Sequence, residues 1–275
     1  RDQGAAQAAG QHEGGMSGLV LSLFPGIGLL DMAFEQEGFC LVRGPDLLWG
    51  GDVKRFRPPA GKFDGVIGGP PCQAFSALRH INPLVGQKHG NMIPEFERCV
   101  AAAEPAWFVM ENVPDAPGPS IAGYAIQCIL LNNRWFGEAQ ERTRRISFGS
   151  VDGRRLHPEF ATFDSPEYSQ AVTSSLRRVP VAIGGSGKPK RTLRPDGKRS
   201  GPSIGRRVEL ADMLRLQGLG ASFFGEDCPF TMTAKRKLIG NGVPLPMGRA
   251  VARAVRKAIG AVPSGAAPAP KAATE

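Results

Sequence analysis

This sequence has no long apolar runs, so we do not expect a membrane protein. Across its 275 residues, no stretch approaches the roughly 18 consecutive apolar residues that a membrane-spanning helix needs. The first residues are rich in Gly, Ala and Gln and hold no apolar core flanked by positive charge, as a secretion signal would. We therefore expect a protein that remains in the cytoplasm.

Paired cysteine motifs are also missing. The five cysteines are an odd number without a CxxC pair, and the four histidines are scattered. These features exclude a disulfide framework and give no indication of a zinc site, so no metal is expected. We expect Cys40, Cys99, Cys128 and Cys228 to be small buried hydrophobes. Any special cysteine must act through its reactivity.

The composition is that of a folded globular protein, with 41% hydrophobic and 21% charged residues, but the net charge of +9 is distributed unevenly. Residues 18–149 hold 12 Lys and Arg against 13 Asp and Glu. Residues 150–207 hold 12 against 5, and residues 208–260 hold 8 against 4. A neutral body joined to a basic second half predicts a surface that binds a polyanion. The alternative is a solvated loop that happens to be basic.

The spacing of apolar residues predicts an α/β fold with a doubly wound, mostly parallel sheet in a body at 18–149. A small basic region at 150–207 interrupts the alternation of strands and helices, and 208–260 returns to the body. Residues 1–17 and 261–275 are predicted mobile tails. The predicted strands are Leu19–Phe24, Phe63–Gly68 and Ala106–Met110, with a hairpin at Trp135–Phe148; the predicted helices are Leu29–Glu37, Ile93–Ala103, 121–132, Val208–Leu216 and Leu245–Ile259.

A glycine-containing turn, Phe24–Gly28, follows the first predicted strand and precedes a helix. Glycines there allow the backbone to approach a cofactor closely. A nicotinamide fingerprint would need glycine at position 31, where the chain has Asp31, so an adenosyl cofactor without a pyrophosphate is favoured. Asp52 could accept a hydrogen bond from an adenine amino group, and Asp46 is a weaker candidate for ribose hydroxyls. The alternative for both acids is a solvated loop carboxylate.

Three further motifs carry reactive side chains. Cys72 lies in the sequence GGPPCQAFS, directly after the second predicted strand, where two prolines stiffen the backbone. Glu111 follows the third strand, so it should emerge on the same rim of the sheet as Cys72. Strand alternation in QERTRR places Gln140, Arg142 and Arg144 on one face.

These groups suit one reaction. Carbon 5 of cytosine is a poor nucleophile, but a thiolate that adds to carbon 6 makes carbon 5 able to attack a methyl sulfonium. Cys72 would supply the thiolate. Charge then develops at N3 and O2, where Glu111 as an acid and Arg144 as a cation would stabilise it. Because a stacked base is inaccessible, the cytosine must be flipped out of its duplex.

With these residues assembled, the chain closely resembles the DNA (cytosine-5) methyltransferase family. LFPGIG, GPPCQAFS, ENV, QERTRR, LADMLRLQG and IGNGVP occur in family order over residues 19–260. The resemblance implies Cys72 as nucleophile, Glu111 at N3, Arg144 at O2, and Arg142 on the phosphate beside the flipped base. It implies S-adenosylmethionine near Phe24, Gly26, Gly28, Asp46, Asp52, Pro70, Asn241 and Val243. DNA contacts are expected from Gln73, Ser76, Lys188, Lys190, Arg191 and Arg194.

The sequence also departs from the family pattern. Leu29 stands where a second glycine is usual, and the stretch Phe39–Asp52 is short. The region expected to read DNA sequence, 150–207, is small. Two alternatives remain: the tRNA-methylating branch, whose typical Cys-Phe-Thr element is missing here, and a catalytically silent DNA-binding relative. The expected partner is double-stranded DNA, and no membrane partner is expected. We expect the protein to be a nucleoid-associated monomer. A cognate restriction endonuclease that acts separately is left open.

Overall fold

The computed structural model describes residues 17–71, 90–161 and 209–260, together with five two-residue strands between the last two ranges. These strands are β8 (Ser169–Gln170), β9 (Arg178–Val179), β10 (Thr192–Leu193), β11 (Arg199–Ser200) and β12 (Arg206–Arg207). β9 pairs with β12 and β10 with β11, both antiparallel. The domain boundaries expected from the sequence remain predictions.

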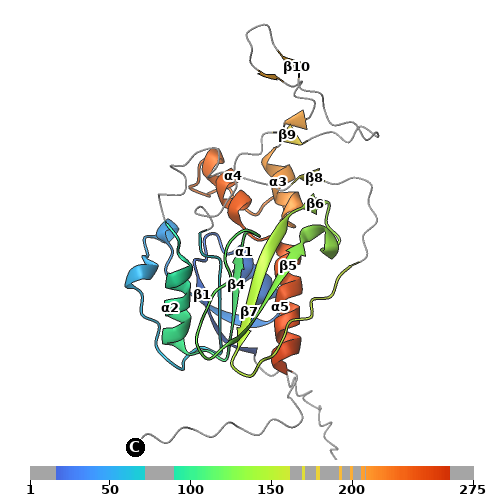
Figure 1. Cartoon of the computed structure of the whole chain (residues 1–275). Coiled ribbons are helices and arrows are strands. Elements are labelled where there is room, and N and C mark those ends of the chain that lie inside the picture. The colour runs from blue at the N-terminus through green and yellow to red at the C-terminus, as the bar shows by residue number, and fades with distance from the viewer. Residues whose placement is uncertain are drawn as a thin grey trace, which may run out of the picture.

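A six-stranded sheet forms the centre of the molecule (Figure 1). Neighbouring strands β2, β1, β3 and β4 are parallel, whereas β7 runs antiparallel to both β4 and β5. The predicted doubly wound, mostly parallel sheet is confirmed. In spatial order the strands are β2 (Phe39–Arg43), β1 (Ser17–Leu23), β3 (Gly65–Gly68), β4 (Trp107–Asn112), β7 (Thr143–Ser150) and β5 (Ala125–Asn132).

Helices cover both faces of the sheet because its central strands are apolar on both sides. On one face, Val20 and Ile67 pack in a core with α1 (Leu29–Gln36) and α5 (Leu245–Gly260). On the other face, Leu21 and Val66 pack in a core with α2 (Ile93–Ala103). Figure 1 shows α2 and α5 on opposite sides of the sheet.

The strand order reverses between β1 and β3, and this reversal creates a place for a ligand. From β1 the chain runs through α1 to β2 on one side, and β3 then pairs with the other edge of β1. In such sheets, ligands bind beyond the carboxyl ends of the strands at the point of reversal. The carboxyl ends of β1 and β3 here lead into the segments that begin at Phe24 and Gly69.

Two helices and several short elements surround this end of the sheet. They are α3 (Leu210–Leu216), α4 (Met232–Asn241), the 3₁₀ turns η1 (Leu47–Trp49), η2 (Val53–Arg55) and η5 (Asn133–Phe136), and β6 (Gln140–Glu141), which pairs with β8. Sequence reasoning missed β2 and α4. No helix of the described residues is long and apolar enough to span a bilayer.

The prediction of a helix at 121–132 was wrong, and so were the bounds of the hairpin. Residues Ala125–Asn132 form β5, an edge strand whose Ile129 lies opposite Ile146 of β7. A short apolar run fits either element, and pairing with β7 decides in favour of a strand. The hairpin therefore joins β5 to β7, and Trp135 lies in η5 between them.

Burial was predicted correctly for Cys99, but not for the other three of these cysteines. Cys40 and Cys128 are exposed, and Cys228 is half-buried. Cys40 and Cys128 lie on β2 and β5, the two edge strands of the sheet. An edge strand has less protein around it than a central strand, so even small apolar side chains can remain in solvent there.

Candidate active site

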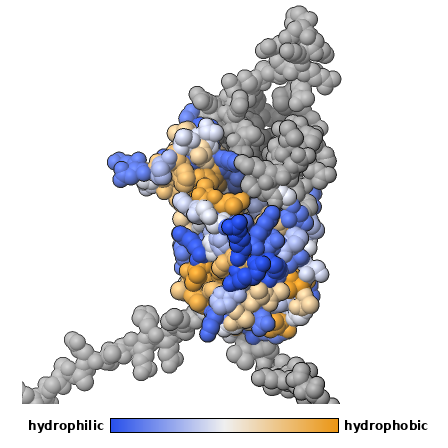
Figure 2. Space-filling view, turned by 90° about the vertical axis from the view of Figure 1, so that its left-hand side faces the viewer, coloured by the Kyte–Doolittle hydropathy of each residue, from blue (hydrophilic) through white to orange (hydrophobic). Residues whose placement is uncertain are grey.

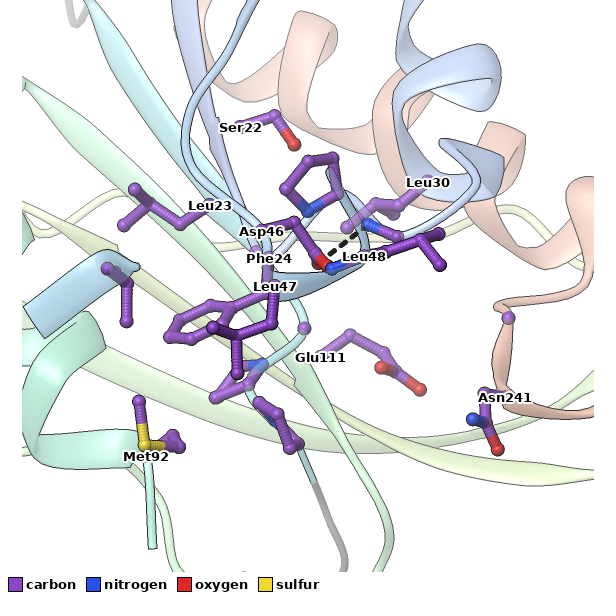
Figure 3. Close-up of a pocket in the computed structure, with 18 of the residues that line it drawn as sticks. Ser22, Leu23, Phe24, Leu30, Asp46, Leu47, Leu48, Met92, Glu111 and Asn241 are labelled. Carbon is purple, nitrogen blue, oxygen red and sulfur yellow. Dashed lines mark hydrogen bonds between the residues drawn. The ribbon is translucent and has the colours of Figure 1, made fainter. Parts of the chain in front are cut away.

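A cavity of about 830 Å³ opens at the carboxyl ends of β1, β3 and β4 (Figure 3). Its volume lies within the range of roughly 300–1,000 Å³ that is usual for small-molecule and cofactor sites. Gly28 and Arg142 are not among the residues that line it. The predicted site residues that do line it are Phe24, Gly26, Asp46, Asp52, Pro70, Glu111, Arg144, Asn241 and Val243.

The glycine turn after β1 uses the left-handed region of backbone space three times. Phe24, Gly26 and Gly28 have φ angles of 55°, 57° and 80°. A Cβ built on Gly26 meets nothing within 4 Å, so the backbone is open to the cavity at that position. Gly28 instead caps the start of α1, where a Cβ would come within 3.2 Å of Arg43. Gly26 is therefore the glycine that leaves room for a cofactor.

Asp46 holds this turn in place. Its two carboxylate oxygens accept hydrogen bonds from the backbone N–H of Gly26 at 3.0 Å and of Leu48 at 2.7 Å. The Trp49 indole N–H donates to the Gly26 carbonyl at 2.8 Å. Asp46 thus organises the cavity wall through its bonds to the backbone.

Hydrophobic side chains are also found on the surface near this turn. Leu47 and Trp49 are each 62% exposed. In Figure 2, hydrophobic residues gather in patches beside a hydrophilic band on one face of the molecule.

Asp52 is better placed than Asp46 to accept a hydrogen bond from a ligand. It caps η2, where its Oδ1 accepts from the Lys54 N–H at 3.0 Å. Within the described part of the chain, Oδ2 of Asp52 has no hydrogen-bond partner. An acceptor on the cavity wall with unused capacity suits an amino group.

Sequence reasoning missed Asp31 as a cavity residue, because it considered this position only for the glycine that it lacks. Asp31 is fully buried, accepts from the Ser22 hydroxyl at 2.5 Å and pairs with Arg43 at 2.9 Å. Burial raises the pKa of Asp31, and its bonds to Ser22 and Arg43 oppose that shift. A carboxylate among the apolar residues of the first helical turn could have indicated such a buried pair.

Glu111 and Arg144, which also line the cavity, form an ion pair. The Arg144 Nε lies 2.8 Å from Oε1 of Glu111, and both side chains are largely buried. Strand register explains the pair: Glu111 lies opposite Ile146, and Arg144 is two residues from Ile146 on the same face of β7. Burial raises the pKa of Glu111, and the charges of Arg144 and Arg142 partly offset the rise.

The segment that leads to Cys72 packs against the same carboxylate. A Cβ on Gly69 would lie 3.2 Å from Oε2 of Glu111. The side-chain amide of buried Asn112 donates to the Pro70 carbonyl at 3.3 Å. The end of β4 therefore supports the backbone just before Cys72.

Strand alternation predicts that Gln140, Arg142 and Arg144 share one face, and in the structure each of them contacts a different element. Arg142 stands in the break between β6 and β7, is only 1% exposed, and donates to the carbonyls of Gly240 and Gly242. Because Arg142 is almost fully buried, contact with a DNA phosphate would require this side chain to become exposed. Sequence reasoning missed Arg145, which donates twice to the Pro114 carbonyl.

Several predicted residues lie outside the described residues, so their roles remain predictions. They are Cys72, Gln73, Ser76, Lys188, Lys190, Arg191 and Arg194.

The family model for the C-5 cytosine-specific DNA methylase matches residues 51–191. That match covers more than half of the chain. The chain belongs to the C-5 cytosine-specific DNA methylase family.

Curated members of this methylase family align with parts of the chain. The Type II methyltransferase M1.HphI of Haemophilus parahaemolyticus is 34% identical over 126 residues, which are 41% of this chain and 32% of that protein. M.NgoPII of Neisseria gonorrhoeae is 28% identical over 47% of each chain. M.HindV of Haemophilus influenzae is 25% identical over 74% of this chain and 76% of that protein. The chain thus spans about a third to a half of the first two relatives.

Solved methyltransferases share the fold of this chain. The Entamoeba histolytica methyltransferase EhMeth has a TM-score of 0.58 at 13% identity, covering 88% of this chain and 98% of its own. A putative DNA modification methyltransferase from an Escherichia coli prophage has a TM-score of 0.58 at 17% identity, covering 88% and 99%. At these identities the likeness shows the fold alone.

The cavity wall has two chemically distinct parts. The part formed by Gly26 and Asp52 offers an open backbone and a carboxylate, which suit an uncharged amino group and a ribose. The other part offers a buried acid and a cation in contact, Glu111 and Arg144. Asn241 lies on the side toward which the Glu111 carboxylate points (Figure 3). A cofactor and a planar polar base would each find suitable partners in this one cavity.

Proposed function

We propose that this protein transfers a methyl group from S-adenosylmethionine to carbon 5 of a cytosine that is flipped out of duplex DNA, through a covalent adduct with Cys72. The observation that carries the proposal is the shared cavity: the ion pair of Glu111 and Arg144 and the open turn at Gly26 line one space. A donor and an acceptor of a methyl group must meet in this way for direct transfer.

The cofactor fits a set of residues along the cavity wall. Gly26 leaves the space that a side chain would fill, Asp52 has unused acceptor capacity, and Asn241 and Val243 lie on the wall. S-adenosylmethionine, when bound, supplies the methyl group as a sulfonium. The residues of the chain hold it, keep water out and activate the base.

Cys72 and Glu111 act together on the base. The Cys72 thiolate forms a bond to carbon 6, and the electron pair displaced from the 5,6 double bond makes carbon 5 nucleophilic. Glu111, as a carboxylic acid, donates its proton to N3, while Arg144 donates a hydrogen bond to O2. After carbon 5 has gained the methyl group, a base or water takes the proton from carbon 5, and the electron pair of that C–H bond restores the 5,6 double bond and expels the Cys72 thiolate. N3 then returns its proton to the Glu111 carboxylate.

The raised pKa of Glu111 supports its role as a proton donor. Burial disfavours its ionised form, and Arg144 prevents the shift from becoming larger. A carboxyl group with a pKa nearer neutrality is a better acid at working pH than a solvated glutamate.

A duplex containing 5-fluorocytosine tests the covalent step. Fluorine leaves no proton at carbon 5 to be removed, so addition and methyl transfer should leave the enzyme attached to the DNA. We expect an adduct that survives denaturation and forms only with S-adenosylmethionine. Methylation sequencing of DNA from expressing cells must first locate the target cytosine, because the recognition sequence is unknown.

Three results distinguish the alternatives. New 5-methylcytosine in duplex DNA supports the proposal, whereas transfer to tRNA alone supports the tRNA-methylating branch. Binding of cofactor and DNA without methylation in any sequence context supports a silent DNA-binding relative. We further propose that the enzyme acts as a cytoplasmic, nucleoid-associated monomer.

A further inference from the structure

Arg142 is an unusually buried cation. It is the largest of the fully buried side chains among the described residues, at 1% exposure. A guanidinium removed from water needs hydrogen-bond acceptors to offset its desolvation. One of its Nη atoms donates to the carbonyls of Gly240 and Gly242, at 2.9 Å each. Arg142 thus holds the backbone on both sides of Asn241.

That segment is the C-terminal end of α4. Carbonyls in the last turn of a helix have no partner within the helix, and the helix dipole gives this end partial negative charge. α4 carries no basic residue in its own last turn. Arg142 supplies the missing cation from the hairpin, almost 100 residues earlier in the chain.

Two glutamines reinforce the same connection. Gln140 donates to the carbonyl of Leu216 at the end of α3, and Gln217 donates to the carbonyl of Ile239 within α4. Both side chains are fully buried. The segment from Gln140 to Arg142 and the ends of both helices therefore form one hydrogen-bonded unit.

This unit determines where Asn241 lies. Asn241 is the last residue of α4 and lines the cavity. In the sequence it stands between Gly240 and Gly242, the two residues whose carbonyls accept from Arg142. On the other side, a Cβ on Gly242 would come within 2.3 Å of Leu29, which follows the glycine turn directly. The segment is held between Arg142 and α1, so a shift at Arg142 would displace Asn241.

We propose that Arg142 is a positioning residue that sets cofactor affinity by holding Asn241 at the cavity, and that it does not bind a DNA phosphate. This inference rests on the proposed function, because it concerns the binding of S-adenosylmethionine in that cavity. It replaces the phosphate contact that the family resemblance implies.

Two substitutions and a control test the proposal. Arg142→Met removes the charge and the hydrogen-bond donors. Arg142→Lys keeps the charge but loses the planar guanidinium group with its fixed set of N–H donors. The control is Arg154→Met, since Arg154 likewise donates to two carbonyls at a helix end, those of Ala258 and Ile259 in α5. Arg154 is not among the residues that line the cavity.

Calorimetric titration of the full chain with S-adenosylmethionine gives the first readout. We expect Arg142→Met to weaken binding of S-adenosylmethionine about tenfold and Arg142→Lys to weaken it less, because Arg142 acts on the cofactor indirectly, through the end of α4. Arg154→Met should lower the melting temperature and leave the Kd for S-adenosylmethionine within about twofold, as an independent site would. If Arg142→Met fails to fold, Arg142→Lys carries the same comparison.

The second readout is DNA binding at several salt concentrations. A lost phosphate contact would lower the slope of log K against log salt by about 0.9, whereas the proposal predicts an unchanged slope for Arg142→Lys and Arg142→Met. A lower slope with an unchanged cofactor Kd overturns the proposal. A cofactor Kd that weakens equally in Arg154→Met also overturns it, because it indicates general destabilisation.

A double-mutant cycle shows whether the effect passes through Asn241. If it does, Arg142→Lys should change cofactor affinity far less in an Asn241→Ala background than in the wild type. Additive effects would contradict the proposal. Failure of the wild-type chain to bind S-adenosylmethionine would refute the proposed function itself, which is a separate outcome.

Discussion

Replacing Glu111 by glutamine should separate activity from stability. The two side chains are almost the same size, and a glutamine oxygen can still accept the hydrogen bond that Arg144 donates at 2.8 Å. The change removes the proton that Glu111 would give to N3. Loss of one preorganised donor of this kind costs about 10²–10³ in kcat, or roughly 3–4 kcal/mol.

Stability should change in the opposite direction at neutral pH. Burial raises the pKa of Glu111 above its ordinary value of 4.5, so the folded chain holds this proton more tightly than the unfolded chain. The corresponding stability is fully present below pH 4.5 and is lost as pH rises through the raised pKa. Glutamine has no such loss, so the stability of the variant relative to wild type should increase over that window.

Methyl transfer to duplex DNA with labelled cofactor measures the first effect, and urea unfolding at a series of pH values measures the second. Glu37→Gln is the control: Glu37 is also buried and pairs with Arg249 and Arg253 at 2.8 Å. It does not line the cavity. The control should lose stability and keep its transfer rate.

Transfer by Glu111→Gln within about tenfold of wild type would refute the role of Glu111 as proton donor, since even one weaker donor is worth more than that. A stability difference that stays flat between acidic and neutral pH would refute the raised pKa. The two results are independent, so one half of the reasoning can fail without the other.

Three further predictions address other parts of the protein. Cys72→Ser should abolish transfer and the 5-fluorocytosine adduct while DNA affinity in a gel-shift assay stays nearly unchanged, because a hydroxyl is far less acidic than a thiol. Gly69→Ala should press a methyl group against Oε2 of Glu111 and lower kcat, with the calorimetric Kd for S-adenosylmethionine unchanged; a weakened Kd would contradict this. Neutralising the basic segment should flatten the salt dependence of DNA binding, whereas a solvated loop predicts the same slope; the changed residues are Lys188, Lys190, Arg191 and Arg194.

Much of the fold could be predicted because apolar periodicity was strong where burial is strong. The strand at β3 and the helix at α2 are buried and were located to within two residues. Residues 125–132 were misassigned because an edge strand shows no regular alternation: the burial of β5 varies irregularly along its length. Its identity depends on pairing with β7, which local spacing does not encode.

The candidate site was predictable where a motif follows a strand, and less so where a side chain reaches a distant element. The position of Glu111 in the cavity could be predicted because this residue lies near the carboxyl end of β4. In contrast, the two bonds of Asp46 to the backbone and the pair of Asp31 with Arg43 depend on how loops return to the cavity. The direction of Arg142 depends on α4, a helix that sequence reasoning did not identify.

The three arginines of QERTRR explain why one short segment matters to the whole cavity. Arg144 pairs with Glu111, Arg145 holds the carbonyl of Pro114 after β4, and Arg142 holds the end of α4. Arg144 and Arg145 point in opposite directions because neighbouring residues of a strand alternate between its faces. Glu111 and the end of α4 are thus both held by β7 and by the residue directly before it. A small displacement of β7 would therefore move both parts of the cavity wall together, which is how a single rigid element can keep two bound groups aligned.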